Sequence, residues 1–255
     1  MVDWALISQI EGWFNLGSLR VWDAFLSHQA AQSLTGNMLE IGVWKGRSAV
    51  VLASYMAPSE RLFLVDLYLK KDDILKSLSS ISCDLDQVAL LQTRSKLIKS
   101  SQEFHSMEEK CRWIHIDGQH AGYSVWHDMA ISDQCLAPKG LLVLDDFFSP
   151  AYPQITVAAL DFLTRNPYAL RLLLVGHNKA YFCRPDALGA YHGFILDELA
   201  ERLEASGANV TICHTSTIGD STVFGIVDRL DKSRKFRGPD WTQGKIECIA
   251  TRDLV

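Results

Sequence analysis

Short, largely apolar segments that stop at glycine or at acidic residues constrain the fold of this chain more than any other feature. They are residues 38–41 before Gly42, residues 113–116 before Asp117 and residues 141–144 before Asp145. Helical patterns separate these segments, and strands that alternate with helices form an open, mostly parallel sheet. The carboxyl ends of parallel strands share one edge of such a sheet, and open α/β proteins bind their ligands there. We therefore expect a ligand site at this edge.

The order of the remaining elements follows from apolar periodicity and turn residues. Apolar residues at helical spacing predict helices within residues 1–36. Strands are expected over Met38–Gly42, Arg61–Asp66, Gln87–Gln92, Trp113–Asp117 and Leu141–Asp145, and helices over Gly46–Met56, Lys70–Ser80, Ser101–Lys110, Val125–Leu136 and Pro153–Arg165. Pro138–Gly140 is expected to be a turn that separates a helix from the strand after it.

The pattern changes in the last third of the chain. Leu170–Val175 and Lys179–Cys183 predict an antiparallel pair joined by a tight turn at Gly176–Asn178. Farther along, a charged amphipathic helix is expected over Phe194–Ser206, and strands over Asn209–His214 and Thr222–Val227 on either side of a Gly219–Asp220 turn.

These patterns together predict an α/β, Rossmann-like fold. We expect a doubly wound, mostly parallel sheet with helices on both faces and an antiparallel last strand. Residues 1–36 are expected to form an N-terminal helical cap, residues 37–184 the cofactor-binding core, and residues 185–255 a C-terminal extension packed on that core.

Composition narrows the class of protein further. The net charge of −5 argues against a nucleic-acid partner, because such affinity comes mainly from neutralised phosphates. No apolar run approaches the roughly 18 residues of a membrane helix, and the N-terminus lacks the basic flank of a signal peptide. Six scattered cysteines with no paired spacing are typical of a reduced, cytoplasmic protein. The basic segment Lys232–Arg237 is either a solvated loop or a site for a phosphate-bearing ligand.

The loop after the first strand carries an acid and two glycines. Gly42 and Gly46 let the backbone approach a ligand closely, although a dinucleotide fingerprint has three glycines. Glu40 lies within the apolar strand, where a carboxylate needs a partner. An ammonium group on a ligand would serve, and so would Lys45 or Arg47.

Asp66 ends the second strand. An acid at this place can accept hydrogen bonds from both ribose hydroxyls of a nucleoside cofactor, or it can cap a turn. The loop and Asp66 together favour a nucleoside cofactor, but they do not distinguish NAD from S-adenosylmethionine (SAM).

Three acids and a histidine follow at the ends of later strands. Asp117, Asp145 and Asp146 offer the oxygen ligands that hard divalent cations prefer, although an Asp-Asp pair also serves as a cap. His120 lies three residues after Asp117, and the pKa of histidine is close to the value that suits a general base. His115, in the middle of the same strand, is expected to be structural.

Residues 38–148 resemble class I, SAM-dependent O-methyltransferases of the divalent-metal-dependent type. The resemblance rests on the loop Glu40–Ser48, Asp66, Ser95, Asp117 and the pair Asp145-Asp146. It extends to the catechol O-methyltransferases and to enzymes that methylate the sugars of macrolides and related natural products. Histidine at 120 and aspartate at 146, where catechol enzymes have lysine and asparagine, favour the sugar-modifying branch.

The resemblance implies a role for each matched residue. Glu40, Gly42 and Ser48 would line the methionine part of SAM, Asp66 would hold the ribose, Ser95 would lie near the adenine, and Asp117 would border the cofactor. Asp117, Asp145 and Asp146 would bind Mg²⁺ or another divalent cation, and His120 would be the catalytic base. Three aspartates around a doubly charged ion would leave one negative charge, which suits a sulfonium cofactor.

The expected function is metal-dependent O-methylation of a small hydroxylated molecule, with a sugar or natural-product hydroxyl favoured. A catechol or phenol O-methyltransferase and a non-catalytic SAM-binding protein are the alternatives, and a nicotinamide-dependent oxidoreductase is a rival from another class. No nucleic-acid or membrane partner is expected. Aromatic residues near the N-terminus are consistent with a homo-oligomer, but a cap packed on its own core explains them equally well.

Overall fold

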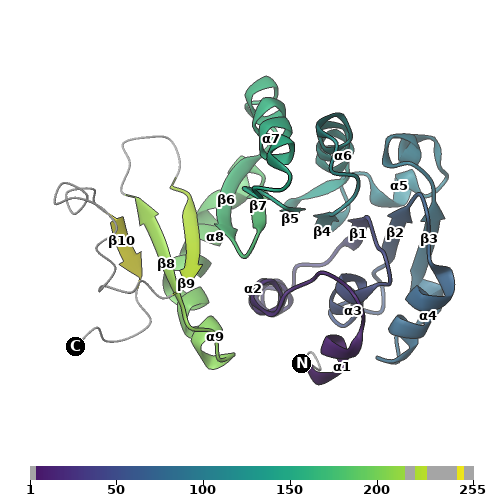
Figure 1. Ribbon diagram of the computed structural model, residues 1–255, viewed down its shortest axis with the longest axis horizontal. Helices are drawn as coiled ribbons and strands as arrows, with labels where there is room; N and C mark the ends of the chain where they lie inside the picture. Colours follow the sequence, from purple (N-terminus) through teal and green to yellow (C-terminus); the bar gives the residue numbers. More distant parts are fainter. Residues whose placement is uncertain (1–3, 216–221, 229–245, 250–255) are drawn as a thin grey trace.

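The computed structural model describes residues 4–215, 222–228 and 246–249 (Figure 1). The strands are β1 (Asn37–Ile41), β2 (Leu62–Asp66), β3 (Val88–Gln92), β4 (Cys111–Ile116), β5 (Leu136–Asp145), β6 (Arg171–Gly176), β7 (Lys179–Cys183), β8 (Val210–Thr215), β9 (Phe224–Asp228) and β10 (Ile246–Ile249). The helices are α1 (Trp4–Gln9), α2 (Leu16–Ala31), α3 (Arg47–Ala53), α4 (Lys71–Ser79), α5 (Phe104–Met107), α6 (Gly122–Cys135), α7 (Pro153–Arg165), α8 (Leu188–Phe194) and α9 (Ala200–Ala205).

All ten strands join one sheet in the order β10-β8-β9-β6-β7-β5-β4-β1-β2-β3. Strands β1 to β5 pair in parallel, whereas β7 is antiparallel to both β5 and β6. The predicted α/β fold with an antiparallel late strand is therefore confirmed. The chain adds β2 and β3 on one side of β1 and then crosses to add β4 on the other. This reversal makes the crevice between β1 and β4 the expected ligand site.

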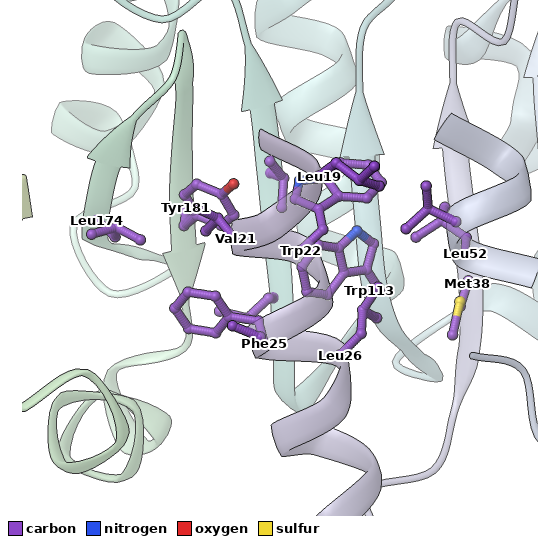
Figure 2. Close-up of a cluster of buried hydrophobic side chains, with 14 of the residues drawn as sticks. Leu19, Val21, Trp22, Phe25, Leu26, Met38, Leu52, Trp113, Leu174 and Tyr181 are labelled. Atoms are coloured by element: carbon purple, nitrogen blue, oxygen red, sulfur yellow. The ribbon is translucent and has the colours of Figure 1, made fainter. Parts of the chain in front are cut away.

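Two apolar cores cover the two faces of the sheet. On one face α2 packs its aromatic side chains against the strands, and Figure 2 shows Trp22 against Trp113 and Phe25 against Tyr181. The ring centroids of these pairs are 5.2 Å and 5.6 Å apart. On the other face α6 and α7 pack on alternate residues of the same strands, such as Ile114. Helices on both faces thus bury the central strands completely, as parallel sheets require.

The segment Pro138–Gly140 differs from the predicted turn. Strand β5 already begins at Leu136, and residues 137–140 form a bulge opposite β4 before regular pairing resumes at Leu141. A Cβ atom on Gly140 would lie 2.7 Å from the carbonyl oxygen of Cys111, so the bulge needs glycine there. The helix and the strand are therefore joined without a separate loop.

The C-terminal segment extends the sheet. Strands β8 and β9 appear close to the predicted positions, and the helical region begins at Leu188, earlier than expected, passing through a π-helical stretch (Ile195–Leu199) into α9. Strand β10 was not predicted. The predicted turn at Gly219–Asp220 and the basic segment Lys232–Arg237 lie outside the described residues. No described helix combines the length and apolarity that crossing a bilayer requires.

Candidate functional site

A cavity of about 730 Å³ opens at the carboxyl ends of β1 to β4. Its walls come from the loops after these strands, at residues 42–45, 66–68, 93–96 and 117–120, from the segment 11–14 between α1 and α2, and from one face of α6. The cavity therefore lies at the edge that the sequence pattern predicts, and it spans the switch point between β1 and β4.

Gly42 forms the floor of the cavity. Its φ of +88° lies in the left-handed region, and a Cβ atom there would lie 2.0 Å from the carbonyl oxygen of Asp117. The loops after β1 and β4 thus lie so close together that position 42 has no room for a side chain. Gly42 is needed to close the sheet edge and to leave space above it.

Asp66 supports the loop after β1 and also faces the cavity. Its Oδ2 accepts a hydrogen bond from the backbone N–H of Val43 at 2.9 Å, and its Oδ1 accepts one from Tyr68 at 2.9 Å. A carboxylate offers about four lone-pair sites. Asp66 can therefore hold the loop and still accept hydrogen bonds from a ligand.

Glu40 is fully buried and does not belong to the cavity wall. Its Oε1 lies 2.7 Å from Nδ1 of His115. Burial raises the pKa of Glu40 to about 8, although the Ser48 hydroxyl and the Lys179 ammonium both act to lower it. Its protonated form is therefore favoured at neutral pH.

The basic residues of the loop after β1 have other partners. Lys45 Nζ pairs with Glu11 Oε2 at 2.5 Å, and Arg47 Nη1 donates to the carbonyl oxygen of Gly12 at 2.9 Å. Both contacts hold the segment 11–14 over the cavity. The N-terminal segment therefore contributes directly to the cavity wall, and neither basic residue is the partner of Glu40.

A buried row of side chains crosses the sheet beneath the cavity. Glu40 contacts His115 through Nδ1, and Nε2 of the same histidine lies 3.5 Å from Lys179 Nζ. Lys179 Nζ in turn lies 2.5 Å from Asp145 Oδ2. Lys179 is only 1% exposed. Burial, together with the charge of Lys179, lowers the pKa of His115 well below its usual value, so this histidine is neutral. His115 is therefore a buried structural residue, as its position in the middle of the strand predicts.

The three predicted metal ligands fall into two overlapping groups. Among the described residues, His115, Asp117 and Asp145 can bring one ligand atom each within 4.8 Å of one another, and so can Asp117, His120 and Asp146. Asp117 belongs to both groups, whereas Asp145 and Asp146 are divided between them. The cluster thus centres on Asp117 and extends in two directions.

Asp117 is the acid of this cluster whose ionised form most needs a nearby cation. Burial and the neighbouring Asp145 raise its pKa well above the usual range, and Lys179 only partly opposes this. Such a carboxyl group needs either a proton or a nearby positive charge. Carboxylate oxygens are also the ligands that hard divalent cations prefer, so the residues present fit an ion of this kind.

Asp146 is held in an unusual backbone conformation beside the cluster. Its φ is +56°, which is uncommon for a residue with a side chain. Its backbone N–H donates to Oδ1 of Asp145 at 2.8 Å, while its own Oδ1 accepts from Asn178 Nδ2 at 2.5 Å. These hydrogen bonds fix the orientation of the Asp146 side chain, although its backbone conformation is strained. Backbone strain of this kind is common at functional sites.

His120 faces the cavity from the loop after β4. Its Nε2 lies 2.9 Å from Oδ2 of Asp146, its ring stacks on Tyr152 with centroids 4.1 Å apart, and its carbonyl oxygen accepts from Gln154 Nε2 at 2.8 Å. If Nε2 donates to Asp146, the neutral ring presents Nδ1 as its proton acceptor. The start of α7 therefore holds this histidine in a defined orientation.

The two predicted serines both reach the cavity. Ser48 lies in the first turn of α3 and is buried, and Ser95 follows β3. Asp128 of α6 lines the same cavity near Ser95, but it could not be predicted from the sequence because a single acid within a helix gives no local signal. The role of Lys179 was not predicted either. The sequence indicated that β7 pairs with β6, but it did not show that β7 also pairs with β5, which brings Lys179 opposite Asp145.

The sheet order, with antiparallel β7 beside β5, and the cavity at the switch point define the fold of class I methyltransferases. Residues 39–147 match the family described as "Methyltransferase domain". This match supports the methyltransferase class that the motifs predict. A comparison with curated protein sequences gave no match.

Solved structures of several methyltransferases share this fold. The O-methyltransferase NovP has a TM-score of 0.54 and 13% identity, covering 66% of this chain and 80% of its own. CalS11, a TDP-rhamnose 3'-O-methyltransferase of calicheamicin biosynthesis, has a TM-score of 0.52 and 17% identity, covering 66% and 78%. The MycE methyltransferase of the mycinamycin pathway, in complex with Mg and SAH, has a TM-score of 0.52 and 18% identity, covering 71% and 53%.

Proposed function

We propose that this protein is a metal-dependent O-methyltransferase whose acceptor is a hydroxyl group of a small sugar or natural product. The observation that carries the proposal is the group Asp117, His120 and Asp146, of which Asp117 and His120 line the cavity. It combines oxygen ligands suited to a divalent cation with a histidine suited to accept a proton. Two structural neighbours support this choice, since one is a TDP-rhamnose 3'-O-methyltransferase and the other is a methyltransferase in complex with Mg and SAH.

The cofactor would lie along the ends of β1 to β3. Gly42 and Ser48 would face its methionine part, Asp66 would accept hydrogen bonds from the ribose hydroxyls, and Ser95 would lie near the adenine. Glu40 would act from behind this wall, since it is buried and paired with His115. SAM supplies an electrophilic methyl group, so the protein must bring an acceptor oxygen into line with it.

The acid cluster would hold the acceptor. Asp117, Asp145 and Asp146 are the residues that would bind a divalent cation, whose charge makes a neighbouring hydroxyl more acidic. His120 would take the hydroxyl proton at Nδ1, because Nε2 is committed to Asp146. The hydrogen bond to Asp146 would also stabilise the imidazolium that forms.

A methyl-transfer assay with magnesium titration tests the proposal. We expect turnover with nucleotide-linked sugars or glycosylated natural products, loss of turnover with EDTA, and a weaker magnesium response in Asp145→Asn. Asp161→Asn, on the outer surface of α7, is the matched control. Unchanged magnesium dependence in Asp145→Asn would contradict the metal-ligand assignment.

The same assay separates the alternatives. Turnover of catechols alone would favour a catechol O-methyltransferase. Binding of S-adenosylhomocysteine (SAH) without turnover of any acceptor in the panel would favour a non-catalytic SAM-binding protein.

A further inference from the structure

Lys179 is a buried cation beside the acid cluster that the proposed function leaves unused. It is the first residue of β7, directly opposite Asp145 of β5, and only 1% of it is exposed. Burying an ammonium group is costly unless neighbouring groups compensate for the lost water. The reason for a lysine at this position must therefore lie in the groups around it.

The neighbours of Lys179 hold its ammonium group against the acid cluster. Nζ lies 2.5 Å from Oδ2 of Asp145 and 3.5 Å from Nε2 of His115. It also lies 5.1 Å from the ring centroid of Phe14 and 5.9 Å from that of Trp22, within reach of cation–π attraction. His115 and Asp145 belong to one of the two groups that could hold a metal ion. That group thus already contacts a positive charge.

Both carboxylate oxygens of Asp145 are engaged in this arrangement. Oδ2 pairs with Lys179, and Oδ1 accepts the backbone N–H of Asp146 at 2.8 Å. The ammonium charge also reaches Asp117, the third member of the group, because Lys179 opposes the rise in the pKa of Asp117 that burial and Asp145 cause. A divalent cation that binds Asp117 and Asp145 would therefore share them with a lysine whose charge repels it.

We propose that Lys179 competes with the divalent cation for Asp145 and thereby keeps metal binding weak and reversible. This inference rests on the metal site of the proposed function. Without metal, the ammonium group holds Asp145 in place of an ion, so the acid cluster does not need metal to remain folded. When metal binds, the charge of the lysine opposes it. A lysine that instead orients Asp145 for the ion would have the opposite effect on metal affinity.

Titration with Mn²⁺ alone tests the inference, with free Mn²⁺ followed by electron paramagnetic resonance. Lys179→Met removes the charge, and Lys179→Gln removes it while keeping a group that can donate a hydrogen bond to Asp145. Both variants should bind Mn²⁺ at least roughly 10-fold more tightly than the wild type, because a unit charge no longer repels the doubly charged ion. Lys179→Arg keeps the charge and should show no such gain. Lys139→Met, at an exposed position in the bulge of β5, is the matched control and should bind as the wild type does.

Thermal unfolding provides a second measurement that needs no acceptor. In EDTA, Lys179→Met should unfold at a lower temperature than the wild type, because Asp145 is left without its partner. The same concentration of Mg²⁺ should raise the unfolding temperature of Lys179→Met more than that of the wild type, since the variant binds the ion more tightly. An equal or smaller rise would contradict the inference. Lys179→Gln serves for both measurements if Lys179→Met does not fold.

The outcomes also distinguish this inference from the proposed function. If the neutral variants bind Mn²⁺ as weakly as the wild type or more weakly, Lys179 does not compete with the ion, and the inference is wrong while the metal site stands. If neither the wild type nor any variant binds Mn²⁺, the metal site fails and the inference fails with it. Tighter binding in the neutral variants, together with methyl transfer that does not depend on metal, would uphold the inference and refute only the metal requirement of the reaction.

Discussion

Replacing Glu40 by glutamine should stabilise the unliganded protein, increasingly so as the pH rises. Glu40 is fully buried, and its pKa is raised from the usual 4.5 to about 8. Glutamine has nearly the shape of a protonated glutamic acid and can still accept a hydrogen bond from Nδ1 of His115. The substitution therefore removes the cost of a buried charge and keeps the contact.

The size of the effect follows from the two pKa values of Glu40. The folded state holds the proton more tightly, so unfolding releases it between about pH 4.5 and pH 8. The contribution of Glu40 to stability consequently falls as the pH rises through this range. The cost is close to zero near pH 4, about 3 kcal/mol at pH 7 and about 5 kcal/mol at pH 9. The Glu40→Gln variant should lack this dependence.

Urea unfolding at pH 5, 7 and 9 measures the difference. The free energy of unfolding of the wild type should fall with pH more steeply than that of Glu40→Gln, and the gap should widen by several kcal/mol between pH 5 and pH 9. Glu204→Gln, at an exposed position on α9, is the control and should follow the wild type. Parallel curves for wild type and Glu40→Gln would refute the assignment of a raised pKa to this residue.

Three further substitutions probe the site. Lys179→Met should lower the free energy of unfolding by about 3–5 kcal/mol, since it leaves a buried carboxylate without its partner, and urea unfolding measures this. Gly42→Ala should destabilise the fold by at least about 1–3 kcal/mol and abolish SAH binding, because its Cβ would meet the Asp117 carbonyl, whereas Gly193→Ala meets nothing within 4 Å and should be tolerated. His120→Ala should reduce kcat by about 10²- to 10⁴-fold with SAH affinity within about twofold of wild type; wild-type turnover would exclude this histidine as the base.

Elements marked by strong local signals could be predicted from the sequence. The strands that end at Gly42, Asp66 and Asp117 are each a short apolar run closed by glycine or acid, and such runs are local features. The hairpin at Gly176–Asn178 was predictable for the same reason. His177 and Asn178 adopt φ values of +49° and +70°, as a two-residue hairpin turn requires.

Features that depend on distant contacts could not be predicted. The bulge at residues 137–140 depends on how β5 meets β4, and a Pro-Lys-Gly sequence looks the same in a turn and in a bulge. The pairing of Lys179 with Asp145 depends on β7 lying next to β5. Asp128 becomes notable only when its burial and its missing partner are known.

The charge balance of the acid cluster changes once Lys179 is included. Asp117, Asp145 and Asp146 carry three negative charges when ionised, and the buried ammonium of Lys179 contributes one positive charge at 2.5 Å from Asp145. His115 adds none, since its pKa is lowered and the ring is neutral. Two negative charges therefore remain, and one divalent cation would balance them.

This balance alters how the site would attract a sulfonium cofactor. An aspartate trio alone would leave one negative charge beside a divalent ion, and that charge would favour a cationic cofactor. With the lysine present no such excess remains, so the attraction must come from groups nearer the cofactor. Asp66 and Asp128 line the cavity itself. Selectivity for SAM would then depend on the cavity wall, and the acid cluster would be reserved for the acceptor and its ion.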